Sequence, residues 1–215
     1  MNKQFKKHLC ISLSFLAAFL LWTAAVKFVD VQPIGPMDTS VGLASVNRFF
    51  HEITGVHMWL YAVTDWLSLI PLAFVLGFAI FGLGQWIKRG HLFRVDGSIL
   101  ALGVFYILVF GAYILFEELV INYRPVLIEG RLEASYPSST TMLVLCVIPT
   151  AMLQFHSRIQ KPVLRKCILS ALPAFAIFMV VGRVISGVHW LTDILGGALL
   201  SAGLVTLYYT AARSK

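Results

Sequence analysis

Charged residues are scarce in this chain of 215 residues: they make up 13% of it, and only 10 are Asp or Glu. Hydrophobic residues make up 59%, and the mean hydropathy is +0.83. A water-soluble domain of this size could not bury so much apolar surface in one core. The composition therefore excludes a soluble domain and indicates an integral membrane protein.

Cysteine is also rare. Cys10, Cys146 and Cys167 show neither a C-x-x-C motif nor the spacing of metal ligands, so they indicate neither a disulfide nor a metal centre. The chain lacks internal repeats and low-complexity tracts, and we interpret residues 1–215 as a single membrane domain. The net charge of +7 does not indicate nucleic-acid binding, because the cations occupy short loops between apolar runs.

Long apolar runs are abundant. A helix that spans a bilayer needs roughly 20 mostly apolar residues, because each residue rises about 1.5 Å through a hydrocarbon layer about 30 Å thick. Six stretches meet or approach this length: 9–28, 66–86, 99–120, 140–155, 167–185 and 191–209. The sequence therefore predicts an all-α, polytopic protein with a six-helix transmembrane bundle.

The distribution of Lys and Arg predicts the orientation of this bundle. When the loops are assigned alternately to the two sides, 12 of the 17 cations fall on the side of the N-terminus and 5 on the other. Because cytoplasmic loops carry the excess of Lys and Arg, we expect a cytoplasmic-membrane protein with both termini in the cytoplasm.

Residues 30–65 form the longest polar interruption, and we expect them to lie at the extracytoplasmic surface. Within this segment Val46, Phe49, Phe50 and Ile53 recur at helical spacing, which predicts an interfacial helix.

Three short polar segments, all expected on the extracytoplasmic side, carry the candidate functional residues. Arg124 follows the third span, Ser138, Ser139 and Thr140 open the fourth, and the turn between the fifth and sixth spans holds three more: Arg183, His189 and Asp193. Arginine presents a planar set of donors that matches phosphate oxygens and stays charged. Together the segments predict a phosphate-handling site.

Each residue type has a defined task in such a site. A helix that starts after Pro137 offers free backbone N–H groups and a positive dipole end to an anion. Asp193 lies four residues after His189, so on a helix its carboxylate can accept the ring N–H and leave the other nitrogen free to attack phosphorus. Structural interpretations exist for each part alone: an interfacial arginine can anchor a helix, and Ser-Ser-Thr-Thr is a common N-cap sequence.

These residues resemble the motifs of the type 2 phosphatidic acid phosphatase superfamily, which includes vanadium haloperoxidases and bacterial lipid phosphate phosphatases. The family pattern is Lys-x6-Arg-Pro, then Pro-Ser-Gly-His, then Ser-Arg-x5-His-x3-Asp. The matching residues are Arg124 and Pro125, then Pro137 and Ser138, then Arg183, His189 and Asp193. The resemblance covers about residues 60–210 and includes the placement of the motifs between the six spans.

The resemblance implies a role for each matched residue. Arg124, Arg183 and Ser138 bind the phosphate, with Ser139 and Thr140 beside them, His189 becomes phosphorylated, and Asp193 orients it. It further implies a lipid phosphate substrate in the bilayer and neither a metal nor another cofactor. Nothing in the sequence points to a particular oligomer.

Four motif positions depart from the family. The lysine is replaced by Glu117, the glycine by Ser139, the histidine by Thr140, and the serine before the arginine by Gly182. The missing histidine is the family's general acid, a function worth about 10²–10⁴ in rate, and a threonine hydroxyl is too weak an acid to replace it.

Three explanations follow from these departures. The first is that another residue acts as the general acid. The candidates on the expected side of the membrane are His51, His57, Glu117 and Glu118, of which His57 and Glu118 are preferred. The second is a diphosphate substrate such as a polyprenyl (undecaprenyl) diphosphate, whose departing phosphate has a pKa of about 6 and needs no proton. The third is that hydrolysis is lost.

The leading hypothesis for the function is a lipid phosphate or polyprenyl diphosphate phosphohydrolase. The alternatives are a catalytically silent lipid-binding or lipid-moving protein and a lipid headgroup phosphotransferase.

Overall fold

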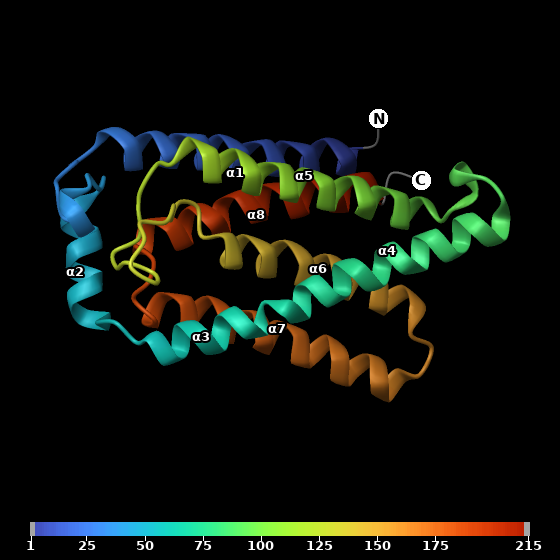
Figure 1. Ribbon diagram of the computed structural model, residues 1–215. Helices are drawn as coiled ribbons and strands as arrows, with labels where there is room; N and C mark the ends of the chain where they lie inside the picture. Colours follow the sequence, from blue (N-terminus) through green and yellow to red (C-terminus); the bar gives the residue numbers. More distant parts are fainter. Residues whose placement is uncertain (1–2, 213–215) are drawn as a thin grey trace.

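The computed structural model describes residues 3–212, which fold into an elongated all-helical bundle (Figure 1). Among these residues the only β-type pairings are isolated bridges. The α-helices are α1 (Lys3–Phe28), α2 (Ala44–Thr54), α3 (Met58–Leu67), α4 (Leu69–Arg89), α5 (Gly97–Leu119), α6 (Ser139–Arg158), α7 (Pro162–Ile185) and α8 (Leu191–Ala212), with 3-10 turns at Pro36–Asp38 and Leu92–Arg94.

The described residues contain 6 candidate membrane spans, formed by α1, by α3 with α4, and by α5, α6, α7 and α8. This confirms the predicted all-α, six-span architecture. The second span begins at Met58 rather than at Trp66 as predicted, and it is interrupted at Ser68. Pro71 explains the interruption, because proline has no N–H to bond the carbonyl of Leu67 and its ring crowds that carbonyl.

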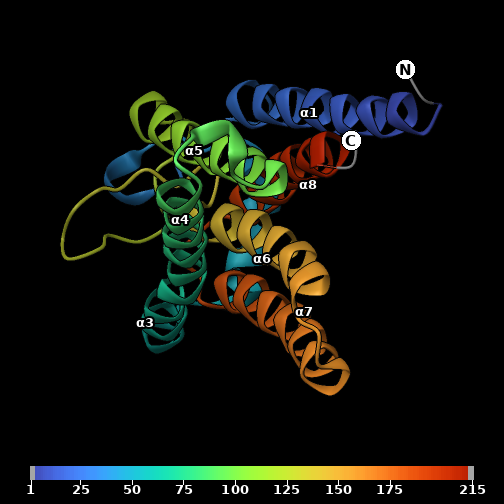
Figure 2. The same cartoon turned by 90° about the vertical axis from the view of Figure 1, so that its right-hand side faces the viewer.

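Helices α6 and α8 form the centre of the bundle (Figure 2). Half or more of their apolar windows are buried, 56% for α6 and 50% for α8, against 6% for α3 with α4. Helix α1 lies along α8, and Gly203 permits this approach, since a Cβ there would sit 2.7 Å from Leu16 Cδ2. Ser12 Oγ also donates to the Gly203 carbonyl at 2.8 Å.

Helix α2 crosses one end of the bundle at a steep angle to the long helices (Figure 1). It forms where the helical spacing predicted it, and Val46, Phe49, Phe50 and Ile53 are exposed. Buried Asn47 fixes it to α8: its Nδ2 donates to Thr192 Oγ1 at 3.0 Å, and its Oδ1 accepts from the Thr192 N–H at 3.2 Å.

The start of α1 and the end of α8 lie at the opposite end of the bundle from α2 (Figure 1). We call the end with α2, the loop of residues 120–138 and the turn of residues 186–190 the site end, and the other the terminal end. At the site end the loop folds back on itself through bridges between Tyr123 and Ala134 and between Ile128 and Arg131. This fold returns the chain beside α8 before α6 begins.

Candidate functional site

The turn between α7 and α8 places His189. Gly187 adopts a φ of +66°, and a Cβ there would lie 1.9 Å from the Gly55 carbonyl oxygen, so the turn requires glycine. The turn is also held from α2 and α3: the His57 backbone N–H donates to the Ser186 carbonyl at 2.9 Å, and a ring nitrogen of His51 lies 3.2 Å from the Gly187 carbonyl oxygen.

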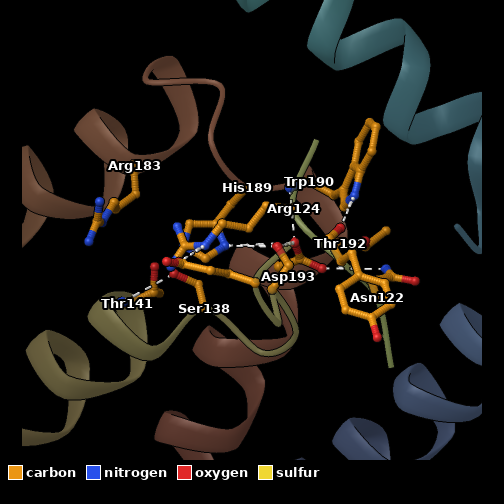
Figure 3. Close-up of polar contacts among 12 residues, drawn as sticks. Asn122, Arg124, Ser138, Thr141, Arg183, His189, Trp190, Thr192 and Asp193 are labelled. Carbon is orange, nitrogen blue, oxygen red and sulfur yellow. Dashed lines mark hydrogen bonds and ion pairs between the residues drawn. The ribbon is translucent and has the colours of Figure 1, made fainter. Parts of the chain in front are cut away.

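His189 and Asp193 lie together in the buried part of the site end (Figure 3). The His189 Nδ1 and Asp193 Oδ2 atoms are 3.8 Å apart, too far for the direct hydrogen bond that the sequence suggested. Ser135 Oγ instead lies 3.1 Å from Nδ1 and donates a short hydrogen bond to Asp193 Oδ2.

This arrangement defines the tautomer of His189. A serine hydroxyl has one hydrogen, and Ser135 gives it to Asp193, so Ser135 must accept the proton on His189 Nδ1. On the other side of the ring, Arg124 Nη1 lies 3.3 Å from Nε2, and an arginine can only donate. Both contacts therefore place the proton on Nδ1 and the lone pair on Nε2, where Arg124 donates to it.

The electrostatic surroundings keep this ring uncharged. Burial, and then the positive charges of Arg124 and Arg183, hold the pKa of His189 well below its usual value of 6.5. A neutral imidazole at pH 7 retains its lone pair, which nucleophilic attack requires.

Asp193 is fixed by further donors. Its Oδ2 accepts the Trp190 N–H at 2.9 Å, and its Oδ1 accepts from Asn122 Nδ2 at 3.5 Å (Figure 3). Its backbone carbonyl accepts the Ser138 N–H at 3.0 Å, which ties the start of α6 to the first turn of α8.

Arg124 reaches His189 from the loop between α5 and α6. Its backbone N–H donates to the Glu133 carbonyl at 3.1 Å, and its Nε lies 3.1 Å from Glu133 Oε2 in an ion pair without hydrogen-bond alignment. The loop therefore supplies both the cation and a carboxylate partner for it.

Arg183 is fully buried near the end of α7, and its side chain points toward the first turn of α6 (Figure 3). Its Nη2 donates to Asp65 Oδ1 at 3.0 Å and, in a short hydrogen bond, to Thr140 Oγ1. The ring of Tyr61 lies against both arginines, 4.9 Å from Arg183 Cζ and 5.8 Å from Arg124 Cζ. The two cations thus share one aromatic wall.

The first turn of α6 completes the site. Ser138 is its N-cap, and its Oγ accepts the Thr141 N–H at 3.4 Å. Ser139 and Thr140 follow, and a cavity of about 290 Å³ beside them is lined by Arg124, Ser135, Ser139 and His189 among others.

Several buried donors at the site end have no hydrogen-bond partner within residues 3–212: Arg183 Nε, Arg183 Nη1, Arg124 Nε and Thr141 Oγ1. Buried polar groups are nearly always paired, and an unpaired one costs about 1–3 kcal/mol, more when charged. Arg124 Nε has the Glu133 carboxylate beside it, whereas the two nitrogens of Arg183 lack any such partner among the described residues, which makes this part of the site end a candidate anion site.

The structure places the other candidates as follows. Glu117 lines the cavity next to Arg124, and His51 packs against Trp190 with ring centroids 5.4 Å apart. His57 is exposed, with a ring nitrogen 2.9 Å from the Thr54 carbonyl oxygen, and Glu118 is exposed at the end of α5. Neither His57 nor Glu118 contacts His189 or the two arginines in the described structure, and their role as acids stays a prediction.

The structure adds residues that the motifs do not contain, above all Ser135 and Asp65. Ser135 stands three residues before Ser138 in a polar run, and Asp65 is a single acid at the start of an apolar span, a signal that often marks function. Over residues 3–212 no three His, Cys, Asp or Glu side chains gather into a group that could hold a metal ion.

The packing of α3 on α7 explains one departure from the family motif. A Cβ at Gly182 would lie 2.8 Å from Thr64 Cγ2, so the serine of the motif has no room here. The same close approach brings Tyr61 and Asp65 of α3 to Arg183.

Comparison with known proteins agrees with this geometry. A model of the family described as the PAP2 superfamily matches residues 7–215. The chain belongs to the PAP2 superfamily. Its fold is similar to the crystal structure of a transmembrane PAP2-type phosphatidylglycerolphosphate phosphatase from Bacillus subtilis, with a TM-score of 0.62, 23% identity, and coverage of 93% of this chain and 94% of that chain. A search of curated proteins finds no match.

As a PAP2 protein, the chain is a multi-pass membrane protein in which the three motif segments converge at the site end. Arg124 of the first segment contacts His189 of the third, and Thr140 of the second contacts Arg183 of the third. Membership of the superfamily and the phosphatase-like fold make a membrane lipid phosphatase the general class to which the site belongs.

Proposed function

We propose that this PAP2 protein hydrolyses lipid phosphates, with a preference for diphosphates, through a phosphohistidine at His189. The observation that carries the proposal is the buried, neutral His189 with its Nε2 lone pair directed at Arg124, next to the unpaired donors of Arg183. Phosphate oxygens would satisfy these donors and bring phosphorus to Nε2.

The chemistry would run in two steps. In the first, Nε2 attacks phosphorus while Arg124 and Arg183 stabilise the charge on the phosphate oxygens, and the bond to the leaving oxygen breaks. Ser135 and Asp193 hold the proton on Nδ1 and stabilise the positive charge that develops on the ring. In the second, water attacks the phosphohistidine and releases phosphate.

A groove supports a lipid substrate. A cavity of about 460 Å³ has Asp65, Ser139 and Thr140 in its wall at the site end and apolar side chains farther along α4 and α5. A second cavity of about 620 Å³ between α4 and α5 shares Val75, Tyr106 and Phe110 with it. The groove is therefore polar at the site end and apolar farther along the helices, which fits a molecule with a phosphate head and a long apolar tail.

Thr140 supports the preference for diphosphates. Its hydroxyl, at the motif position of the general acid, is engaged by Arg183 and is a poor proton donor. A departing phosphate group, with a pKa of about 6, leaves without a proton, whereas an alkoxide requires one. The excess of Lys and Arg on the terminal side supports an extracytoplasmic site that acts on exported lipids.

The test is phosphate release by purified protein from matched lipid mono- and diphosphates, including a polyprenyl diphosphate. We expect release from diphosphates and a loss of about 10⁴-fold or more in His189→Ala, since it removes the nucleophile. His156→Ala is the matched control, because His156 is exposed at the terminal end. Absence of release from every substrate would reject hydrolysis and favour lipid binding, and transfer to a lipid acceptor instead of water would favour a phosphotransferase.

A further inference from the structure

Asp65, which belongs to none of the motif segments, shares a nitrogen of Arg183 with the residue at the motif position of the general-acid histidine. That position is Thr140, and Arg183 Nη2 binds both Thr140 Oγ1 and, at 3.0 Å, Asp65 Oδ1. One nitrogen therefore holds the Asp65 carboxylate next to the threonine hydroxyl.

The two sides of the Arg183 guanidinium have different tasks. Nη2 is engaged by Asp65 and Thr140, whereas Nε and Nη1 are buried without partners in the described residues. A phosphate bound by Nε and Nη1 would leave the contact to Asp65 in place. Because the guanidinium is planar and rigid, it would then fix the carboxylate at a constant position relative to phosphorus.

Asp65 also differs from the buried members of the site in the exposure of its side chain. Its side chain is 56% exposed, whereas those of His189 and Asp193 are 1% and 0% exposed. It lines the groove with Ser139 and Thr140, and this is the side on which the leaving group departs if the lipid tail occupies the groove. Since attack and departure are in line, the hydrolytic water enters from that same side.

Glu133 is the other carboxylate paired with a site arginine, but it lies on the side of the nucleophile. It lines the same cavity as His189 and Arg124, and its contact is to Arg124 Nε at 3.1 Å. It therefore serves as a comparison for Asp65 and not as an equivalent base.

We propose that Asp65 is the general base that activates water for hydrolysis of the phosphohistidine at His189. The proposal rests on the proposed function. A base suits a diphosphate substrate, because its first step needs no acid and its second step needs a group that takes a proton from water, which a carboxylate can do.

The proposed step balances. The water oxygen forms a bond to phosphorus, and Asp65 takes one of its protons. The bond between phosphorus and Nε2 breaks, and its electron pair returns to Nε2, so His189 regains its neutral form with the proton on Nδ1. Hydrogen phosphate leaves, and Asp65 gives its proton to a water molecule.

Rapid-quench kinetics with the full-length protein and a polyprenyl diphosphate test this role. Three quantities are measured: the burst of lipid monophosphate, the acid-labile phosphoenzyme, and steady-state phosphate release. In Asp65→Asn we expect the burst to remain, the phosphoenzyme to accumulate, and phosphate release to fall about 10²–10⁴-fold. Asp65→Glu, which keeps a carboxylate, and added formate should each restore part of the release.

Two variants complete the design. Glu133→Gln should weaken substrate binding through Arg124 without accumulation of phosphoenzyme, and Glu52→Gln, at an exposed position of α2, should behave as wild type. Wild-type phosphate release in Asp65→Asn would overturn the role of base. Loss of the burst in Asp65→Asn, with no recovery in Asp65→Glu, would overturn it too, because Asp65 would then only position Arg183. By contrast, a burst that persists in His189→Ala would refute the phosphohistidine and hence the proposed function.

Discussion

Each end of the bundle holds arginines and carboxylates in contact, and the two clusters differ in how completely they are paired. At the terminal end, Asp96 accepts from Gln85 Nε2 and Arg89 Nη1, both at 2.9 Å, and from Arg158 Nη1 at 3.0 Å. Arg158 gives its other donors to Gln154 and Ser98. At the site end, Arg183 is more deeply buried and yet keeps two nitrogens without partners among the described residues.

The difference separates a structural role from a binding role. A cluster in which each donor has an acceptor joins helices, here α4, α5 and α6, and has no further capacity for a ligand. A buried arginine with unpaired donors lowers the stability of the empty protein, and a bound anion compensates for that loss. Substitutions in the two clusters should therefore have opposite consequences for activity and stability.

The largest effect is expected when substitutions of the buried Arg183 and of the partly buried Arg158 are compared directly. Arg183→Ala should lower kcat/KM for phosphate release by about 10²–10³-fold with little loss of thermal stability, because the Nε and Nη1 atoms proposed to bind the phosphate have no partner in the described residues to lose. Arg158→Ala should leave kcat/KM intact and lower the free energy of unfolding by about 1 kcal/mol, because it leaves Asp96 with fewer partners. Steady-state kinetics and thermal unfolding measure both effects. If Arg158→Ala lowered kcat/KM and Arg183→Ala lowered only the stability, the distinction between the two clusters would be wrong.

A smaller effect is expected at Ser135. Ser135→Ala breaks the link between His189 Nδ1 and Asp193, but the carboxylate remains 3.8 Å from the ring and can still orient it in part. We expect phosphoenzyme formation to slow about tenfold, the equivalent of about 1.4 kcal/mol, and Ser135→Thr to recover rate because it restores the hydroxyl. Unchanged pre-steady-state rates in the alanine variant would show that Ser135 only fills space.

The smallest effect is a pH dependence of stability at the terminal end. Gln85, Arg89 and Arg158 hold the pKa of Asp96 at about 2, below its ordinary value of 3.8, despite the opposing effect of burial. The charged form is the one stabilised, so this contribution is present above about pH 4 and is lost as the pH falls toward 2. Wild type should therefore unfold at a higher temperature than Asp96→Asn at pH 6, and the gap should narrow as the pH falls from 4 toward 2. A constant gap would contradict the linkage.

Individual helices show which features of the fold could be predicted from the sequence. Hydropathy located all six spans, because the length of an apolar run and the thickness of a bilayer are both local quantities. It misplaced the start of the second span, since Thr64 and Asp65 separate the apolar residues 58–63 from the longer apolar run that follows. The spacing of α2 identified a helix because Phe49, Phe50 and Ile53 share one face.

Motif spacing also named residues that the fold brings together: Arg124 contacts His189, and Arg183 contacts Thr140. The sequence could do this because an i, i+4 pair and a capped helix start are defined over a few residues. Their roles in catalysis remain predictions, to be decided by the kinetics above.

The sequence by itself determined the six apolar helices. It also predicted an orientation and a phosphate site with arginine, serine and histidine positions, and all of these inferences depend on local composition and spacing. Only the tertiary structure decided that Ser135 stands between His189 and Asp193, that Gly182 has no room for a side chain against Thr64, and that Asp65 meets Thr140 on Arg183. The physical reason is distance along the chain, because these contacts join residues from different helices and loops. The residues next to a donor in the sequence do not show whether that donor has a partner in the folded protein.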